Sequence, residues 1–400
     1  MKEIEAVWRI ESAKVIAGLA RMVRDVGLAE DLAHEALVSA LETWPRSGAP
    51  DNPGAWLMAA AKNRALDHFR RAKMLEQKHA EFALEQDVSF EPDWDDDIGD
   101  DLLRLVFTAC HPVLSTEARV ALTLRLLGGL TTDEIARAFL VPEPTIAQRI
   151  VRAKRTLSEA RVPFQAPAAA ERAERLASVL EVIYLVYNEG YSATAGADWM
   201  RPALCDEALR LGRILAGMLP QEPEVLGLVA LMELQASRFR ARLDANGAPV
   251  LLMEQDRSRW DQLLIRRGMA ALSQIRGPLG PYGLQAAIAA CHARARTADE
   301  TDWPRIVGLY DALAELTGSP VVEVNRAVAV AMAFGPAAGL EIVDQLELKD
   351  YYLLHAVRGD LLAKLGRVDE ARTEFNRATT LTRNEAERKV LARRAAMKGV

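Results

Sequence analysis

The chain has 400 residues, half of them apolar, and a formal net charge of −6 at pH 7. This length exceeds one ordinary domain, and the abundance of Ala, Leu, Arg and Glu favours helices over strands. No apolar stretch of about 18 residues is present and the charged start lacks a signal-peptide core, so we expect neither a membrane span nor export. Cys110, Cys205 and Cys291 show no metal-binding or disulfide spacing, which is typical of a protein of the reducing cytoplasm.

The first predicted module covers residues 1–78 and is helical. In the helix predicted over Leu28–Trp44, apolar residues recur on one face, and Asp31 and Glu35 share another face. Two carboxylates at this spacing suit a catalytic pair, a metal site, a docking surface or plain solvation. The first two need a companion base or ligand, and only His34 is near. Docking on a basic partner is therefore the favoured functional interpretation, with solvation as the alternative.

A second helix of this module begins at Asn52-Pro53, a capping residue followed by a proline in the first turn. Its exposed side carries basic and polar side chains that suit phosphates and bases. The candidate DNA-binding residues are Lys62, Asn63, Arg64, Asp67, His68, Arg70 and Arg71. Trp56 suits stacking on an unpaired base, but a position in the core is the favoured interpretation for it.

An acidic segment, residues 79–101, follows. It holds ten acidic residues and no Lys or Arg, so the acidity of the chain is concentrated there. Pro92, Gly99 and a run of aspartates predict a flexible linker rather than a packed element. When extended, its 23 residues reach roughly 75 Å. An alternative role is autoinhibition, in which the acids cover Arg149 and Arg152 of the next module.

Residues 102–162 form the second predicted module, and residues 131–157 within it have the pattern of a helix-turn-helix. Thr131 and Glu134 predict a capping box that opens a short helix, and Leu140–Pro142 predicts the turn. Spacing predicts an inward face made by Ile135, Ala136, Phe139, Ile146, Ile150 and Leu157.

The outward face of the second helix suits the major groove of DNA. The amide of Gln148 pairs with adenine, and the guanidinium of Arg149 or Arg152 pairs with guanine. The candidate DNA-binding residues of this helix are Glu143, Thr145, Gln148, Arg149, Arg152, Lys154 and Arg155. The alternative is a basic, solvated helix in an ordinary bundle. Capping, turn, core spacing and base-recognising side chains coincide here, which favours the helix-turn-helix.

Residues 172–400 follow a Pro/Ala segment at Pro163–Pro167 and are predicted to be successive helices with short Gly and Pro breaks. Residues 359–378 match a tetratricopeptide pattern. Tyr184–Tyr191 and Glu254–Asp261 carry aromatic and charged side chains, but no nucleophile–base spacing, Gly-rich loop or metal motif accompanies them. We expect no catalytic residue, metal or cofactor. The charges of the second segment are more simply a salt-bridged helix contact or a groove lining.

Three segments in this order, Ala29–Glu35, Asn52–Arg71 and Glu134–Lys154, resemble regions 2 and 4 of sigma-70-family factors. The chain is similar to the extracytoplasmic-function (ECF) group, and its C-terminal half resembles the members that carry a fused tetratricopeptide-like domain. The resemblance implies an all-α fold with a region 2 bundle, an acidic linker, a region 4 helix-turn-helix and a large helical domain. Leu140 and Pro142 depart from the pattern, because the turn often carries Gly and the cap is usually Ser or Thr.

The resemblance also implies a function, that of an RNA polymerase sigma factor acting at −35/−10 promoters, cytoplasmic and nucleoid-associated, and not itself an enzyme. Asp31 and Glu35 would dock on core polymerase, the Asn63–Arg71 helix would bind the −10 element, and the Glu143–Lys154 helix the −35 element. The C-terminal domain would regulate the sigma half and bind a protein or peptide regulator. Its candidate interaction residues are Tyr187, Asn188, Glu189, Tyr191, Asp256, Arg257, Arg259 and Trp260. The alternatives are a stand-alone helix-turn-helix regulator with a ligand- or peptide-sensing helical domain, and a repeat scaffold with a vestigial DNA-binding head.

Overall fold

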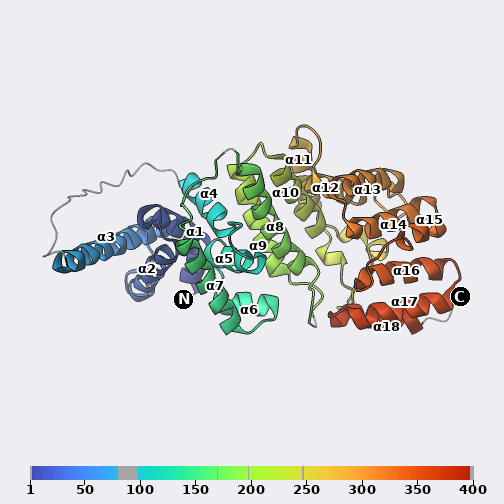
Figure 1. Cartoon of the computed structure of the whole chain (residues 1–400), viewed down its shortest axis with the longest axis horizontal. Coiled ribbons are helices and arrows are strands. Elements are labelled where there is room, and N and C mark those ends of the chain that lie inside the picture. The colour runs from blue at the N-terminus through green and yellow to red at the C-terminus, as the bar shows by residue number, and fades with distance from the viewer. Residues whose placement is uncertain (1, 80–97, 169, 197, 246, 397–400) are drawn as a thin grey trace. The chain divides into compact units, whose positions relative to one another are not determined.

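The computed structural model describes residues 2–79, 98–168, 170–196, 198–245 and 247–396. Every regular element in these ranges is a helix, apart from two isolated β-bridges, which confirms the all-α prediction (Figure 1). The chain divides into two compact units, Met1–Ile183 and Tyr184–Val400. The boundary falls inside α8, about a dozen residues after the start of the predicted C-terminal domain.

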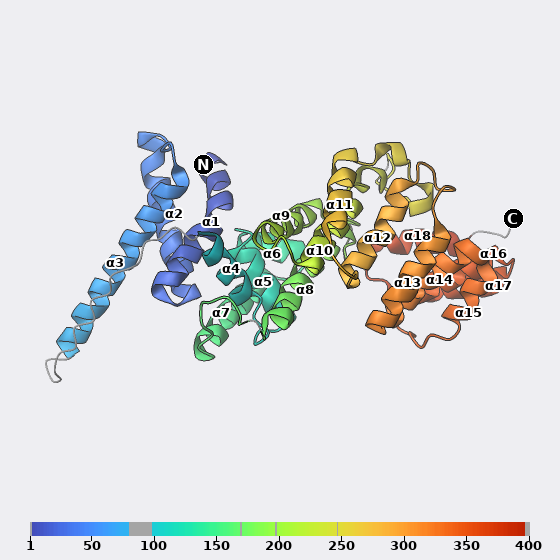
Figure 2. The ribbon, with the colours of Figure 1, turned by 90° about the horizontal axis from the view of Figure 1, so that it is seen from above.

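Three helices open the first unit, namely α1 (Lys2–Val23), α2 (Val26–Ser47) and α3 (Pro53–His79). The carboxylate of Asp25 accepts from the N–H of Leu28 at 2.8 Å and caps α2. Asn52 accepts from the N–H of Ala55 at 3.0 Å, so the predicted cap of α3 is present. The three helices pack on one another, and Figure 2 shows the second half of α3 projecting beyond α1 and α2.

The core of this bundle uses the apolar faces that the sequence predicts. Leu32, Ala36 and Trp44 of α2 are buried. Trp44 meets Trp56 edge-on, with ring centroids 5.4 Å apart. Trp56 is half-buried in this contact, so it packs against the core, as the favoured interpretation expects, without lying inside it.

Four further helices follow in the first unit, namely α4 (Ile98–Ala109), α5 (Thr116–Leu126), α6 (Thr132–Phe139) and α7 (Glu143–Glu159). Helix α4 packs along α1. The predicted linker ran to residue 101, but its last residues form the first turn of α4, and Asp101 is buried between Arg21 (3.3 Å) and Arg104 (2.9 Å). These two arginines give the carboxylate a place in a packed helix that the net charge of the segment does not suggest. Residues 80–97 of the predicted linker lie outside the described residues.

Helix α8 (Arg172–Tyr191) begins in the first unit. The hydroxyl of Ser178 donates to the carbonyl of Cys110 at 2.7 Å, and Arg119 lies 3.0 Å from the carboxylate of Glu181. The first half of α8 is therefore joined to the α4–α5 pair, and any division of the chain before α8 would break these contacts.

The second unit continues with α9 (Pro202–Met218), α10 (Pro223–Ala236), the 3₁₀ turns η1 (Phe239–Ala241), η2 (Leu252–Glu254) and η3 (Arg257–Arg259), and then α11 (Gln262–Gln274), α12 (Pro281–Arg294), α13 (Trp303–Thr317), α14 (Pro320–Phe334), α15 (Pro336–Val343), α16 (Tyr352–Lys364), α17 (Val368–Leu381) and α18 (Glu385–Ala396). Helices adjacent in sequence are neighbours in space. In the α16–α17 pair, a Cβ at Gly359 would meet the ring of Phe375 at 3.0 Å, so a larger residue here would require the ring to shift by a few tenths of an ångström. The tetratricopeptide pattern predicts such a small-on-large contact, and the assignment to that repeat class stays a prediction.

Candidate DNA-binding and polymerase-docking surfaces

Helices α6 and α7 form the predicted helix-turn-helix. The hydroxyl of Thr131 accepts from the N–H of Glu134 at 3.2 Å, and the carboxylate of Glu134 accepts from the N–H of Thr131 at 2.8 Å. This reciprocal pair is the predicted capping box. Of the predicted inward face, Ile135, Ala136, Ile146, Ile150 and Leu157 are buried as expected, whereas Phe139 is half-buried.

The two departures in the turn have structural counterparts. Leu140 adopts a left-handed backbone with φ 53°, a conformation that costs an L-residue roughly 1–2 kcal/mol. Pro142 precedes α7 and offers no side-chain hydrogen bond to its N-terminus. Capping and packing therefore hold the motif together without the usual Gly and Ser/Thr.

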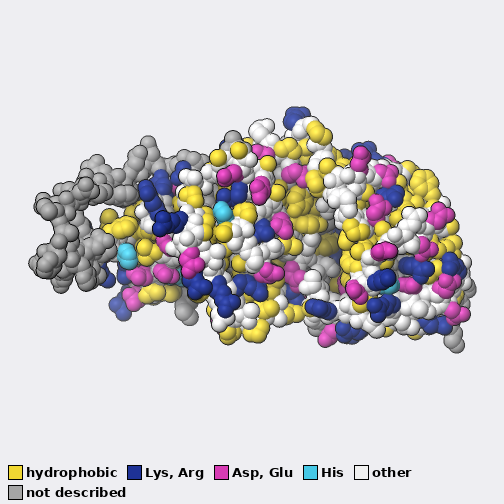
Figure 3. All heavy atoms as spheres, in the orientation of Figure 1, with side chains coloured by type: hydrophobic (Ala, Val, Ile, Leu, Met, Phe, Trp, Pro, Cys, Tyr) yellow, Lys and Arg dark blue, Asp and Glu magenta, His cyan; other side chains and the backbone are white. Residues whose placement is uncertain are grey.

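The outward face of α7 is open to solvent. Of the seven candidates on this helix, those that are exposed are Glu143, Thr145, Gln148, Arg152 and Arg155, while Arg149 is half-buried. Figure 3 shows Lys and Arg side chains gathered over α7. The row combines one amide with several guanidiniums, which suits contacts to base edges and phosphates in a major groove.

Lys154 lies away from this face. Its ammonium is 2.5 Å from the Oε2 of Glu30 and 3.9 Å from the Oδ1 of Asp31. The Nε of Arg125 donates to the Oε1 of Glu30 at 2.6 Å. Burial would raise the pKa of Glu30, which is only 2% exposed, but the facing Lys154 and Arg125 outweigh it and lower the pKa. One candidate −35 residue is thus engaged by α2, next to a candidate docking residue.

Sequence reasoning missed the roles of Glu30 and Arg125. Glu30 directly follows Ala29, which is fully buried, so its place at the edge of the apolar face of α2 was visible, but its partners were not. His34, weighed as a companion base for the carboxylates of α2, instead completes this cluster. Its Nε2 accepts from Arg125 at 2.9 Å and its Nδ1 donates to the carbonyl of Glu30 at 2.8 Å.

The candidate docking residues are exposed on α2, with side chains 75% exposed for Asp31 and 53% for Glu35. The candidate row on α3 is also exposed at Asn63, Arg64, Asp67, His68, Arg70 and Arg71, and half-buried at Lys62. Arg64 joins the two surfaces, since it donates to Glu35 at 3.2 Å and to Ser39 at 2.8 Å. An ion pair this exposed contributes less than about 1 kcal/mol, so either residue can leave it for a partner.

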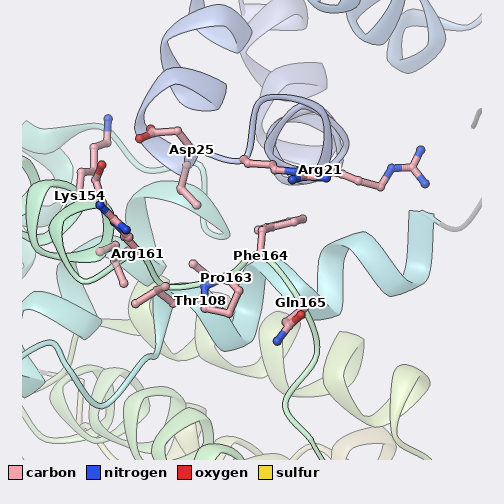
Figure 4. Close-up of a pocket in the computed structure, with 13 residues that line it drawn as sticks. Arg21, Asp25, Thr108, Lys154, Arg161, Pro163, Phe164 and Gln165 are labelled. Carbon is pink, nitrogen blue, oxygen red and sulfur yellow. The ribbon is translucent and has the colours of Figure 1, made fainter. Parts of the chain in front are cut away.

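A cavity of about 630 Å³ lies between the start of α2 and the end of α7. Lys154, Asp25 and Arg161 lie along one side of it in Figure 4, whereas the side chain of Arg21 points away from them. Lys154 lines this cavity, and its side chain is 20% exposed. When Lys154 separates from Glu30, the charge of Lys154 therefore remains in contact with solvent.

The eight C-terminal candidates differ in accessibility. Those that are buried are Tyr187, Glu189, Arg257 and Trp260, those that are half-buried are Asn188 and Tyr191, and those that are exposed are Asp256 and Arg259. The buried hydroxyl of Tyr187 donates to the carbonyl of Met232 at 3.0 Å, and Glu189 pairs with Arg201. These buried side chains have partners inside the second unit.

Residues Glu254–Asp261 were expected to form a salt-bridged helix contact or a groove lining, and the first of these expectations is wrong. The segment consists of η2 and η3 with extended residues around them. Asp256 accepts from the N–H of Ser258 at 3.0 Å, and Asp261 accepts from the N–H of Leu263 at 2.8 Å and caps α11. Short Asp side chains bind nearby backbone N–H groups in this way, which favours turns and the starts of helices over helix interiors.

A second cavity, of about 300 Å³, lies in the second unit and has a mainly apolar lining that includes Trp199, Tyr352 and Val357. None of the eight predicted residues lines it. The apolar pair Leu353 and Val357, four residues apart and half-buried on α16, was the signal in the sequence.

No described helix is long and apolar enough to cross a membrane. Among the residues whose positions are given, no three His, Cys, Asp or Glu side chains gather as metal ligands would.

The first unit combines a helix-turn-helix with a three-helix bundle in which α2 carries exposed acids and α3 carries an exposed basic row. This combination is the architecture of a sigma factor. Residues 10–74 match the model of sigma-70 region 2, residues 104–157 match that of sigma-70 region 4, and residues 175–276 match a family of unknown function (DUF6596). The chain belongs to the sigma-70 family of RNA polymerase sigma factors, in its ECF group.

Individual relatives agree with this assignment. An uncharacterized protein of Rhizobium meliloti is 45% identical, over 94% of this chain and 90% of its own length. The ECF RNA polymerase sigma factor SigK of Mycobacterium ulcerans is 30% identical, over 36% of this chain and 78% of its own length. The probable ECF RNA polymerase sigma factor SigI of Mycobacterium tuberculosis is 29% identical, over 40% of this chain and 56% of its own length.

Proposed function

We propose that this sigma factor brings core RNA polymerase to −35/−10 promoters in the cytoplasm and initiates transcription there. The outward face of α7 binds the −35 element, the exposed row of α3 binds the −10 element, and Asp31 and Glu35 dock on the polymerase. The observation that carries the proposal is the solvent-exposed row around Gln148 and Arg152 on a capped helix-turn-helix. The printed names of the mycobacterial relatives, which call them RNA polymerase sigma factors, support the choice of partner.

Promoter binding requires the two DNA-binding regions to separate. Two promoter elements about two turns of DNA apart lie roughly 70 Å apart along the axis. In the structure α7 contacts α2, and Lys154 and Arg125 of the second region are bound to Glu30 of the first. This arrangement is the resting form in our proposal, and release of Glu30 accompanies docking.

The C-terminal unit regulates the sigma half in this proposal and takes the place of a separate anti-sigma factor. Support comes from α8, which continues into that unit and whose first half bonds to the α4–α5 pair through Ser178 and Glu181. We expect a chain ended after Ile183 to keep these bonds and to give a transcription level different from that of the full chain. An unaltered level would count against regulation while leaving the sigma function untouched.

Co-elution of the purified full chain with bacterial core RNA polymerase tests the proposed partner. We expect the native chain to join the core and an Asp31→Arg/Glu35→Arg variant to lose at least about ten-fold in affinity, since two attractive charges become repulsive. A Glu5→Arg/Glu42→Arg variant is the matched control, because it makes the same change of charge at exposed positions of α1 and α2. Equal loss in both variants, or no binding by the native chain, would overturn the docking assignment.

A further inference from the structure

Three arginines of the second unit, Arg238, Arg242 and Arg257, gather without a carboxylate. Arg242 is 4% exposed and Arg257 is 8% exposed, and Arg238 is half-buried. Within the described ranges, none of the three has an Asp or Glu oxygen inside the 4.0 Å limit of an ion pair. Glu300 acts on Arg257 only at longer range, and more weakly than Arg238 does.

Three aromatic rings lie over the three guanidinium groups, and the centre of one of them, the Trp199 ring, lies 4.4 Å from the guanidinium carbon of Arg242. The guanidinium carbon of Arg242 lies 3.5 Å from the centre of the Tyr191 ring, and that of Arg238 lies 5.7 Å from it. Arg238 also lies 5.7 Å from the ring of Trp260, and Arg257 lies 5.2 Å from the same ring. Ring faces attract cations but bring no negative charge, so the positive charge of the cluster is not neutralised.

This positive charge, together with burial, lowers the pKa values of the neighbouring basic groups. Burial and then the nearby Arg238 lower the pKa of Arg257, and burial lowers that of Arg242, where Arg238 also contributes. Burial, followed by Arg238 and Arg257, lowers the pKa of His292 to about 3, so this imidazole is neutral. Buried charge without a counter-charge is unfavourable, and a bound anion is the simplest relief.

Several guanidinium nitrogens of the cluster donate to neutral acceptors. Arg257 donates to the carbonyls of His292 and Ala295 and to the hydroxyl of Thr301. Arg242 donates to the carbonyl of Tyr191, but two other N–H groups have no acceptor. The indole Nε1 of Trp260 and the Nε of Arg257 are buried N–H groups with no acceptor in the described structure. Arg238 donates to the hydroxyl oxygen of Tyr191, which leaves the hydroxyl proton available. Carboxylates and phosphates carry acceptors only, and the fork of a guanidinium matches both in geometry.

We propose that Arg238, Arg242 and Arg257, with Tyr191 and Trp260, form a binding site for a small oxyanion, a carboxylate or a phosphate. Two of the guanidiniums are almost fully buried, so a nucleic acid or a protein surface is excluded as the ligand. Arg238, which is half-buried, is the group that a small ligand contacts first. The site joins the ends of the two segments, Tyr184–Tyr191 and Glu254–Asp261, to η1 and α12. It assigns a role to residues that the sigma function leaves unused, and it is independent of promoter binding.

Thermal unfolding of the full chain in sodium phosphate, sodium citrate or sodium chloride at one ionic strength tests the site. We expect phosphate, citrate or both to raise the melting temperature of the native chain saturably above the chloride reference. Arg238→Gln should weaken this effect at least about ten-fold in anion concentration, as expected for loss of a charge-assisted pair. Arg240→Gln is the matched control, since Arg240 is exposed and two residues away.

The ligand-free melting temperature gives a second, independent sign. Removing one charge from an uncompensated cluster should raise it or leave it unchanged, whereas an arginine that merely stabilises the fold would lower it. Trp260→Phe keeps the ring and removes only the unpaired N–H, so it should weaken anion binding a few-fold without lowering the ligand-free melting temperature. Absence of an anion effect in the native chain, or equal effects in the native chain and all three variants, would overturn the proposal.

Discussion

Each unit of this chain holds a buried charged cluster, and the two clusters differ in their counter-charges. In the first unit, Glu30 is buried between Arg125 and Lys154, so the acid and its cations neutralise one another. In the second unit, Arg238 and Arg242 lie together with no acid at ion-pair distance among the described residues. A charge neutralised within the chain forms a contact that an outside partner must break. A charge left without a counter-charge is one that an outside partner can neutralise.

The largest effect should come from breaking the neutralised cluster with Glu30→Gln. The variant keeps the shape of the side chain and leaves Arg125 and Lys154 without their anion. Removal of one partner of a buried pair costs about 3–5 kcal/mol, and we expect the low end because Lys154 borders a cavity. Urea unfolding monitored in the first unit measures the loss of free energy of unfolding.

The control for this variant is Glu35→Gln, at an exposed pair on the same helix with Arg64. We expect it to lose less than about 1 kcal/mol. Similar losses for the two variants would mean that burial does not set the strength of the Glu30 contact. Combined with Lys154→Met, Glu30→Gln should cost less than the sum of the two single variants, because they share one interaction.

The second effect comes from His292, which stays uncharged beside the cluster that lacks an acid. The pKa of His292 is about 3 in the folded unit, below its ordinary value of 6.5. As the pH falls below 6.5, the unfolded state takes up a proton that the folded state does not, so stability declines down to about pH 3. At 1.36 kcal/mol per pH unit, lowering the pH from 7 to 5 should cost up to about 2 kcal/mol through this group.

Urea unfolding of the second unit at pH 7 and pH 5 measures this decline. The variant His292→Gln should lose that part of the pH dependence, while the native chain keeps it. An equally steep decline in the variant would show that another group carries it. A bound anion should make the decline shallower, because it offsets the charge of the arginines and raises the pKa of the imidazole toward its ordinary value.

Local rules predicted most of the fold. The capping box of Thr131 and Glu134, the Asn52 cap and the buried faces of α2 and α7 involve residues within a few positions of each other. The start of α4 was missed because the pairing of Asp101 with Arg21 is a long-range contact. The segment Glu254–Asp261 was misjudged because capping by its aspartates outweighed charge alternation.

The candidate surfaces show the same difference between local patterns, which the sequence predicts, and long-range contacts, which it does not. Gln148, Arg152 and Arg155 recur on one side of α7, as helical periodicity predicts. Lys154 is two residues after Arg152, about 200° around the helix, so periodicity alone already separates it from the outward face. Its partner was out of reach of such rules, because Glu30 lies on another helix, α2, far from Lys154 in the sequence.

The smallest effect should come from Arg9→Ala, at a second ion pair between the same two DNA-binding regions. The Nη2 of Arg9 lies 2.7 Å from the Oε1 of Glu134, a distance close to those in the Glu30 cluster, but the side chains are 50% and 27% exposed. Solvent screens this pair, and we expect a loss of about 0.5 kcal/mol or less in the same urea measurement. Glu134 keeps its capping role in the variant, because its Oε2 still accepts from the N–H of Thr131. A loss as large as that of Glu30→Gln would mean that distance rather than burial decides which contact holds the two regions together. A loss near zero would leave Glu30 as the charge that docking on polymerase has to release.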